Sequence, residues 1–460
     1  MKPVRALAAA AMLGLAGCSH YARYEAKPLD PAEASAALDA RSLSDGGLRR
    51  FLAQNGQAPA AWPPPAWDFE PLCWAAFYYN PSLAVARAQW AAARAGVEVA
   101  GARPNPTVSL LPDYATNAGS GVSPWLSGIN FDVPITTAGK RSRQVESARQ
   151  STEAARQAVF SAAWQVRAQL EAALIDLDAA RRRLDAVRRQ AESQRRAAGL
   201  LEARHAAGAI DAQELAVSRI ALSRAEASLA DAERQVPLQR QQVAQALGVP
   251  VAAIEGVRLP APGPAVLPPP ALAAARREAL LNRPDVLAAL ARYEAAQAAL
   301  ALEVARQYPD LHLGPGYQYD QGQNEWTLGL TFEIPVFQHN QAAIAQAEAN
   351  RAEAAAEFTA LQAKLIGEID AAASAAAASR AQAAALSRLE AEVERQGERA
   401  GERRRQGGAD ELDVQNSRLE AATADLARID AQAQAAHDAC RLEDALQVPL
   451  PSFSNVLTSP

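Results

Sequence analysis

The feature that most constrains the fold is a helical pattern that runs without proline or glycine from Lys140 to Gln194. Its apolar positions are spaced alternately by four and three residues, which is the spacing of a coiled-coil seam: Val159, Ala163, Val166, Leu170, Ala173, Leu177, Ala180, Leu184, Val187 and Ala191. At 1.5 Å per residue, the span from Ala138 to His205 is about 100 Å long. One globular domain cannot bury such a helix, so it must lie against other long helices.

A segment of alternating polarity precedes this helix at residues 125–133, and Pro134 ends it. Its apolar and polar side chains fall on opposite sides, as Ile129, Phe131 and Val133 against Gly128, Asn130 and Asp132. A period of two predicts a β-strand. The same unit occurs again, because residues 326–334 alternate, Pro335 ends them, and a long helical pattern follows from about 341 to 406.

Matching segments recur at a nearly constant offset of 199–203 residues. They pair Asn80-Pro81 with Asn282-Arg283-Pro284, Asn105-Pro106 with Tyr308-Pro309, Pro134 with Pro335, Ser218-Arg219 with Ser417-Arg418, and residues 246–250 with 445–449. The chain is therefore a tandem duplication.

The duplication sets the expected domain boundaries. We predict a signal peptide at 1–17, an extended N-terminal tether at 18–70 that lies over the surface, a first repeat at 71–250, a Pro-rich linker at 251–270, a second repeat at 271–449 and a tail at 450–460. Each repeat holds a helix, a strand pair, a long helix and a return helix. The first helix is expected at about 71–103, its first strand at 107–114, and a polar turn at 321–325.

The N-terminus has the pattern of an export signal, with Lys2 and Arg5 before the apolar stretch Ala6 to Leu15. The following Leu15-Ala16-Gly17-Cys18 resembles a bacterial lipoprotein processing site, in which Cys18 carries the lipid. The alternative is an ordinary signal peptide followed by a chance cysteine. In lipoprotein sorting, Ser19 after the cysteine resembles the outer-membrane destination.

The net charge limits the possible binding partners, and the cysteines after Cys18 have two possible states. The formal net charge is -5, which becomes -7 once Lys2 and Arg5 are removed, so a nucleic-acid partner is not expected. The arginine runs at 181–183 and 403–405 are interpreted as solvated helix faces. Cys73 and Cys440 either pair in the oxidising exterior or are buried as small apolar residues, and we favour burial.

The strands have the length and alternation of membrane strands. Each is about nine residues long, with one apolar face and one small and polar face, and the predicted lumen-facing residues are Asn130, Asp132, Thr327, Thr331 and Glu333. The alternative is a pair of soluble hairpins with one buried face. Four strands cannot close a barrel, so several copies of the chain must form a ring.

This layout resembles the TolC family of outer-membrane efflux proteins, from about residue 70 to 449. The resemblance implies a mainly α fold with a small transmembrane β part. Tandem-duplicated long antiparallel coiled-coil helices form an α-barrel, and four strands per chain contribute to a trimeric 12-stranded β-barrel. It implies a homotrimer in the outer-membrane lipid with a large periplasmic part, a periplasmic adaptor (membrane fusion protein) and an inner-membrane RND-type pump as partners. Cys18 is similar to the anchor of the lipoprotein branch, and Pro104-Asn105-Pro106-Thr107 and Ala138-Gly139-Lys140-Arg141 are similar to members that serve heavy-metal cation pumps.

The resemblance also assigns the turns between the long helices to periplasmic tips. Candidate tip and adaptor-contact residues are Gly208, Asp211, Glu214, Gly407, Gly408 and Asp410, and candidate gate residues are Asp413 and Asn416. A ring of carboxylates at the gate would attract cations. The alternative for Asp410 and Asp413 is a solvated helix N-cap at the positive end of the helix dipole.

No catalytic constellation, cofactor loop or metal-ligand cluster is predicted, so an enzyme is not expected. The five histidines include no i, i+4 pair. Two functions remain: a passive outer-membrane export duct, and a periplasmic coiled-coil scaffold or adaptor without a pore. The transported substrate, metal cation or drug, does not follow from the sequence.

Overall fold

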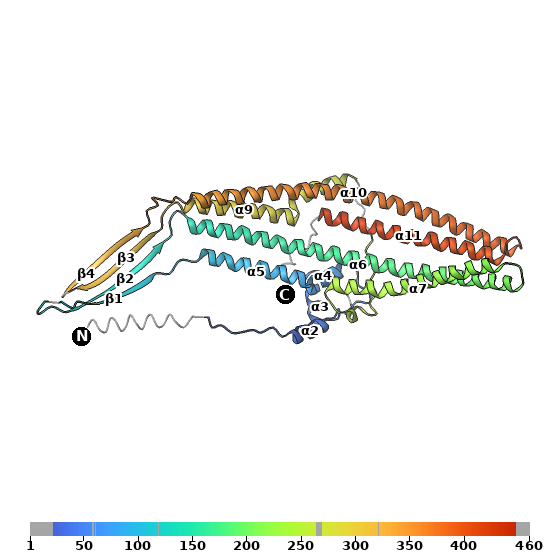
Figure 1. Cartoon of the computed structure of the whole chain (residues 1–460), viewed down its shortest axis with the longest axis horizontal. Coiled ribbons are helices and arrows are strands. Elements are labelled where there is room, and N and C mark those ends of the chain that lie inside the picture. The colour runs from blue at the N-terminus through green and yellow to red at the C-terminus, as the bar shows by residue number, and fades with distance from the viewer. Residues whose placement is uncertain are drawn as a thin grey trace. The chain divides into compact units, whose positions relative to one another are not determined.

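The computed structural model describes residues 22–57, 59, 61–117, 119–263, 269–320 and 322–447 (Figure 1). The predicted signal peptide, Cys18 and the tail at 450–460 lie outside the described residues. The chain divides into two compact units, residues 1–41 and 42–460. The first unit contains helix α2 (Pro31–Asp39), whose N-cap Asp30 accepts a hydrogen bond from the backbone N–H of Ala32 at 2.8 Å.

The second unit contains the two repeats in the predicted order, with lengths close to those expected. The first repeat comprises α4 (Phe69–Tyr79), α5 (Pro81–Gly101), β1 (Thr107–Tyr114), β2 (Trp125–Ile135), α6 (Lys140–Ala206) and α7 (Ala212–Leu247). A 3-10 helix, η2 (Val251–Ile254), follows. The second repeat comprises α8 (Pro269–Asn282), α9 (Pro284–Ala305), β3 (Leu311–Asp320), β4 (Gln323–Phe332), α10 (Gln341–Arg405) and α11 (Glu411–Leu446).

The prediction of an extended tether is wrong for the part from residue 42 to 70. This part forms helix α3 (Gly46–Gln54), capped by Asp45, and it packs into the core. Leu48 and Leu52 are fully buried, and Trp67 in the Pro-rich stretch is only 1% exposed. Tertiary packing of scattered aromatic side chains, rather than a regular period, orders this segment.

The single helix expected over 71–103 is also wrong, because it breaks at Asn80 into α4 and α5. Pro81 cannot donate a backbone hydrogen bond and disfavours a helical residue before it. Asn80 instead caps α5 by accepting from the backbone N–H of Ser82 at 2.9 Å. Its amide donates to the carbonyl of Ala246 at 3.0 Å, so the break holds the end of α7.

The second repeat makes the corresponding contact with different chemistry. Arg283, which precedes Pro284 as Asn80 precedes Pro81, donates to the carbonyl of Ala445 at the end of α11. The expected turn at 321–325 is shorter than predicted, because Gln323, Asn324 and Glu325 pair with the end of β3 and belong to β4.

The four strands form one antiparallel sheet in the order β1-β2-β3-β4. The pairing of β2 with β3 joins the two repeats, while β1 and β4 are the edges. Figure 1 shows the sheet at one end of the long helices of this unit. Pro112 lies in edge strand β1, where a missing N–H is tolerated.

The helices pack around α6, which contacts α5, α7, α9 and α11. Of the ten predicted seam positions of α6, all but Ala180 and Leu184 are buried. Leu170, Leu174 and Leu177 have no exposed surface, and with α3, α4 and α7 they form the main core. Cys73 and Cys440 are both buried free thiols, as favoured from the sequence.

Candidate functional site

One face of the sheet is polar, and its register brings the predicted lumen-facing residues together. Asn130 in β2 pairs with Gly316 in β3, and Gly316 pairs with Thr327 in β4. A side chain at position 316 would collide with Asn130 Oδ1 and Thr327 Oγ1, so all three residues share this face. By the alternation of strands, Asp132 and Thr331 lie on the same face.

Acidic groups dominate the charge of this polar face. Asp132 accepts from His312 Nδ1, with its two oxygens at 2.9 and 3.1 Å, and both side chains are about half exposed. Glu333 directly follows the last residue of β4 on the same alternation. The register adds three more carboxylates, from Asp113, Asp320 and Glu325. The sequence has no Lys or Arg at 104–139 or 307–350, so no guanidinium or ammonium group of the strands offsets them.

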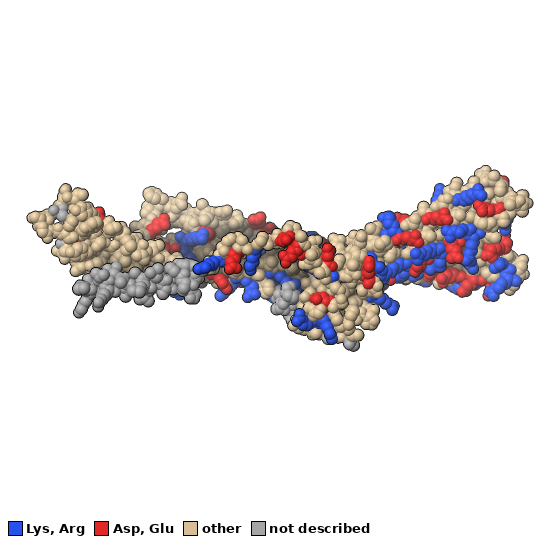
Figure 2. Space-filling view, turned by 90° about the horizontal axis from the view of Figure 1, so that it is seen from below, with Lys and Arg blue, Asp and Glu red and all other residues tan. Residues whose placement is uncertain are grey.

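The opposite face is apolar and exposed, with an aromatic pair near the turn of each hairpin. Tyr114 and Trp125 have ring centroids 4.9 Å apart, and Tyr317 and Trp326 are 5.0 Å apart. Trp326 is 81% exposed and Leu328 is 74% exposed. Figure 2 shows the sheet end as nearly free of charged side chains on the visible face, whereas the far ends of the long helices carry both signs.

The first tip, residues 207–211, connects α6 to α7. Gly208 has φ +73°, and no atom lies within 4 Å of the position that a Cβ would take. Its role is therefore conformational, because it turns the chain in the left-handed region. Asp211 is the N-cap of α7 and accepts from the backbone N–H of Glu214 at 2.8 Å. The predicted tip residues therefore lie together, and Asp211 has a capping role.

The second tip, residues 406–410, connects α10 to α11 through Gly407, whose φ is +78°, and Gly408. Asp410 and Asp413 form a reciprocal capping box, with N–H to carboxylate distances of 2.9 and 3.0 Å. The backbone N–H of Asp413 and then the guanidinium of Arg204 lower the pKa of Asp410. The helix-cap alternative is thus observed for Asp410 and Asp413, while the Asn416 side chain is exposed.

Ion pairs connect the hairpin of α6 and α7 to the hairpin of α10 and α11. Arg183 donates to Asp430 at 3.0 Å, Arg189 donates to Asp425 at 2.5 Å, and Arg204 pairs with Asp410 between the two tips. Asp425 also accepts from Arg428, which contacts Glu390 on α10 at 3.1 Å. The arginine run at 181–183 therefore bridges helices rather than only facing solvent, since Arg181 also donates to the carbonyl of Leu259.

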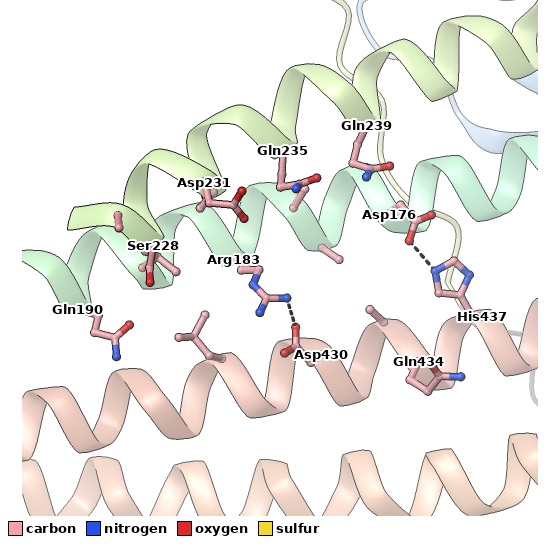
Figure 3. A pocket seen from close by; sticks show the side chains of 17 residues that line it. Asp176, Arg183, Gln190, Ser228, Asp231, Gln235, Gln239, Asp430, Gln434 and His437 are labelled. Atoms are coloured by element: carbon pink, nitrogen blue, oxygen red, sulfur yellow. Dashed lines mark hydrogen bonds and ion pairs between the residues drawn. The ribbon is translucent and has the colours of Figure 1, made fainter. Parts of the chain in front are cut away.

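A polar groove separates the hairpins beside these pairs (Figure 3). Its volume is about 790 Å³, its wall is formed by α6, α7 and α11, and His437 contacts Asp176 across it at 2.7 Å. Ten polar side chains line it: Asp176, Arg183, Gln190, Ser228, Asp231, Gln235, Gln239, Asp430, Gln434 and His437. Polar contacts, rather than apolar packing alone, therefore connect the two hairpins beside this groove.

The two repeats match a protein family directly. The family model described as "Outer membrane efflux protein" matches residues 76–249 and 275–447, which is most of both repeats. The chain belongs to the outer membrane efflux protein family. The efflux and outer-membrane assignments predicted from the sequence are thereby confirmed at the level of this family, and no curated protein matches.

Several solved structures of membrane proteins have the same fold. The outer membrane protein VceC of Vibrio cholerae aligns with a TM-score of 0.67 at 22% identity, covering 82% of this chain and 95% of VceC. A membrane protein of Pseudomonas aeruginosa gives 0.68 at 22%, covering 93% and 97%. The outer-membrane channel OprN gives 0.69 at 20%, covering 93% and 98%. The mainly α fold with a small antiparallel sheet is thereby confirmed.

Within the described residues, no helix is both long and apolar enough to cross a bilayer. Across the same ranges, no group of three or more His, Cys, Asp or Glu side chains is arranged to hold a metal ion.

Sequence reasoning missed the ion pairs between the hairpins. Arg189 and Asp425 are 236 residues apart, and Asp176 and His437 are 261 apart. The duplication offers the only signal for them, because it predicts that the two return helices lie on equivalent sides of their long helices. It does not predict which side chains meet.

Proposed function

We propose that this protein is the outer-membrane channel of a tripartite efflux system and conducts substrates passively from a pump and adaptor to the exterior. The observation that best supports this proposal is the exposed four-stranded sheet, which is apolar on one face and polar on the other. Within the described residues, its edge strands β1 and β4 pair with no strand on their outer sides. In lipid, such edges leave backbone groups unsatisfied. Three copies joined edge to edge would give a 12-stranded barrel and pair them all.

The polar face then lines the barrel lumen. Asn130, Asp132, Thr327, Thr331 and Glu333 are the proposed lumen residues, and the carboxylates without Lys or Arg neighbours would favour cations. This supports cationic cargo, and heavy-metal cations are the proposed substrates. The second repeat's aromatic pair, Tyr317 and Trp326, would lie at a bilayer interface.

The tips are proposed as the periplasmic entrance and adaptor contact. Gly208, Asp211, Glu214, Gly407, Gly408 and Asp410 are the proposed adaptor contacts, with Asp413 and Asn416 as gate residues. The ion pairs of α6 with α11 would hold the hairpins in a closed arrangement, which parts when the adaptor binds. An inner-membrane RND-type pump would supply the energy, because the sequence predicts no phosphate-binding loop.

The proposed trimer is anchored by lipid at Cys18 in the outer membrane, with its helices in the periplasm. The position of Cys18 after an export signal supports this anchor. Metabolic labelling with a palmitate analogue, with Cys18→Ser as the unlabelled control, would test it.

The test of the channel uses neighbouring residues on opposite sheet faces. Leu328→Arg places a charge on the apolar face, which costs about 2–4 kcal/mol per chain at the bilayer midplane, whereas Thr327→Arg faces the polar side. We expect Leu328→Arg to lose heat-modifiable trimer from the outer-membrane fraction and Thr327→Arg to keep it. Planar bilayers should show conductance steps for wild type. Equal trimer for both variants, or a wild type that is monomeric and folded in detergent-free buffer, would overturn the proposal.

A further inference from the structure

The connection from sheet to long helix occurs twice, at equivalent positions of the two repeats and with different side chains. Residues 135–143 form the first junction and residues 336–344 the second, at the repeat offset of 201. Each long helix begins after a left-handed residue, Gly139 with φ +71° before α6 and Asn340 with φ +58° before α10. The left-handed residue before the long helix is therefore common to both junctions, whereas their side-chain chemistry differs.

The first junction is basic in a place where its own helix disfavours cations. Lys140, Arg141 and Arg143 lie in the first turn of α6, and that turn has no acidic residue. Cations at a helix N-terminus are unfavourable because they face the positive end of the helix dipole. Lys140 is compensated by Asp310 at 2.8 Å, but Arg141 and Arg143 form no ion pair within the described part of the chain. An anion from outside the chain would remove this conflict.

A hollow is lined in part by residues that directly precede this basic stretch in the sequence. Its volume is about 520 Å³, and it is lined by Thr137, Ala138, Tyr308, Pro309 and Leu311. Ala138 is two residues before α6, and the mainly apolar wall includes the ring of Tyr308, which is 62% exposed. An apolar hollow whose lining residues adjoin a basic stretch of the chain suits a molecule with a phosphate and a hydrocarbon part.

The second junction is apolar, and its large side chains are exposed. Ile334 is 68% exposed and Val336 is 65% exposed, and both follow the alternation of the apolar row of β4; Phe337, next in the chain, is 98% exposed. Gln341, Ala342 and Ile344 replace the basic residues of the first junction.

We propose that the junctions contact the inner-leaflet phospholipid of the outer membrane. Arg141 and Arg143 bind the phosphate of an anionic headgroup, the Tyr308 hollow holds the adjoining glycerol and acyl carbons, and Phe337 enters the boundary between headgroups and acyl chains. This inference rests on the proposed channel function, because only a membrane-spanning sheet brings the junctions to that depth. The continuity with the apolar sheet face and the charge complementarity select lipid as the partner.

The test measures phospholipid retained by the full-length trimer with native mass spectrometry, after delipidation and addition of phosphatidylglycerol or phosphatidylcholine. Wild type should prefer phosphatidylglycerol about tenfold, and Arg141→Gln with Arg143→Gln should lose most of that preference. The control is Arg403→Gln with Arg405→Gln in the last turn of α10, which makes the same charge change. Inorganic phosphate at the same concentration should not displace the lipid.

Unchanged preference in the Arg141/Arg143 double variant, or equal loss in the control, would overturn the inference, and so would displacement by phosphate alone. A spin label at Phe337→Cys should be more accessible to oxygen than to a nickel chelate in vesicles, and the reverse would also count against it. Conductance steps are recorded on the same samples. A wild type that forms trimeric channels without a lipid preference refutes this inference alone, whereas a wild type without channels refutes the proposed function.

Discussion

Gly248→Ala should destabilise the protein because two separate costs meet at this position. Gly248 ends α7 with φ +77°, and a left-handed alanine costs about 1–2 kcal/mol. An added Cβ would also lie 2.7 Å from the carbonyl oxygen of Tyr79 and 3.0 Å from Cα of Asn80. These are backbone atoms held by the Asn80 contact with Ala246, so they cannot turn aside, and overpacking adds about 1–3 kcal/mol. The expected loss is about 2–5 kcal/mol.

The matched control is Gly256→Ala. Gly256 has φ +72° but no atom within 4 Å of an added Cβ, so only the left-handed cost of about 1–2 kcal/mol applies. With an unfolding entropy of about 2.1 cal/mol/K per residue over roughly 400 residues, the melting temperature should fall by about 2–6 °C for Gly248→Ala and about 1–2 °C for the control. Thermal melts followed by circular dichroism at fixed scan rate compare the two. Equal melting temperatures would refute the argument that the backbone approach at Tyr79 matters.

Two further outcomes are expected. Asp425→Asn with Asp430→Asn removes the negative charges that pair with Arg189 and Arg183. This should weaken the closed arrangement by about 1–2 kcal/mol after allowance for the exposed arginines, so the open fraction in bilayer recordings should rise roughly five- to thirtyfold. Asp185→Asn, an exposed control, should leave the open fraction unchanged. Burial, and then the charge of Glu443, raises the pKa of Glu171 above its ordinary 4.5, with Arg167 opposing the rise. Folding therefore favours its protonated form, so its contribution to stability is full below pH 4.5 and is lost as the pH rises through the raised pKa. Glu171→Gln should flatten that part of the melting profile, and parallel profiles would contradict this.

The sequence predicted those elements whose side chains repeat with a regular period. The seam of α6 and the alternation of residues 125–133 agree with the observed positions of α6 and β2, because each pattern depends on local geometry alone. The segment around Trp67 has no period, and its burial depends on α6 and α7, which are distant in the chain. The polar start of β4 reads as a turn, but its pairing with β3 satisfies the backbone and extends the strand.

The candidate site likewise has parts that the sequence predicts and parts that it does not. The polar face of the sheet was predicted because strand alternation assigns Asn130 and Thr327 without knowledge of their neighbours. The capping box of Asp410 and Asp413 was open to two interpretations, since a carboxylate at a helix start also suits a gate. The ion pair of Arg189 with Asp425 depends on how α6 and α11 are rotated about their axes. The heptad pattern does not determine that rotation to within one residue, so it does not predict which charged side chains meet.

The two repeats show which contacts the fold requires and which it leaves free. Where α7 and α11 end, both repeats keep a donor to a backbone carbonyl, but Asn80 serves in one and Arg283 in the other. The small amide brings the backbones so close that position 248 must be glycine, whereas the corresponding Gln447 carries a full side chain. In a threefold ring the six hairpins would therefore alternate between two kinds of contact. Gly248→Ala would strain three of them and leave the other three intact, so the loss of stability should be shared equally by the three chains and should not open the ring at one seam.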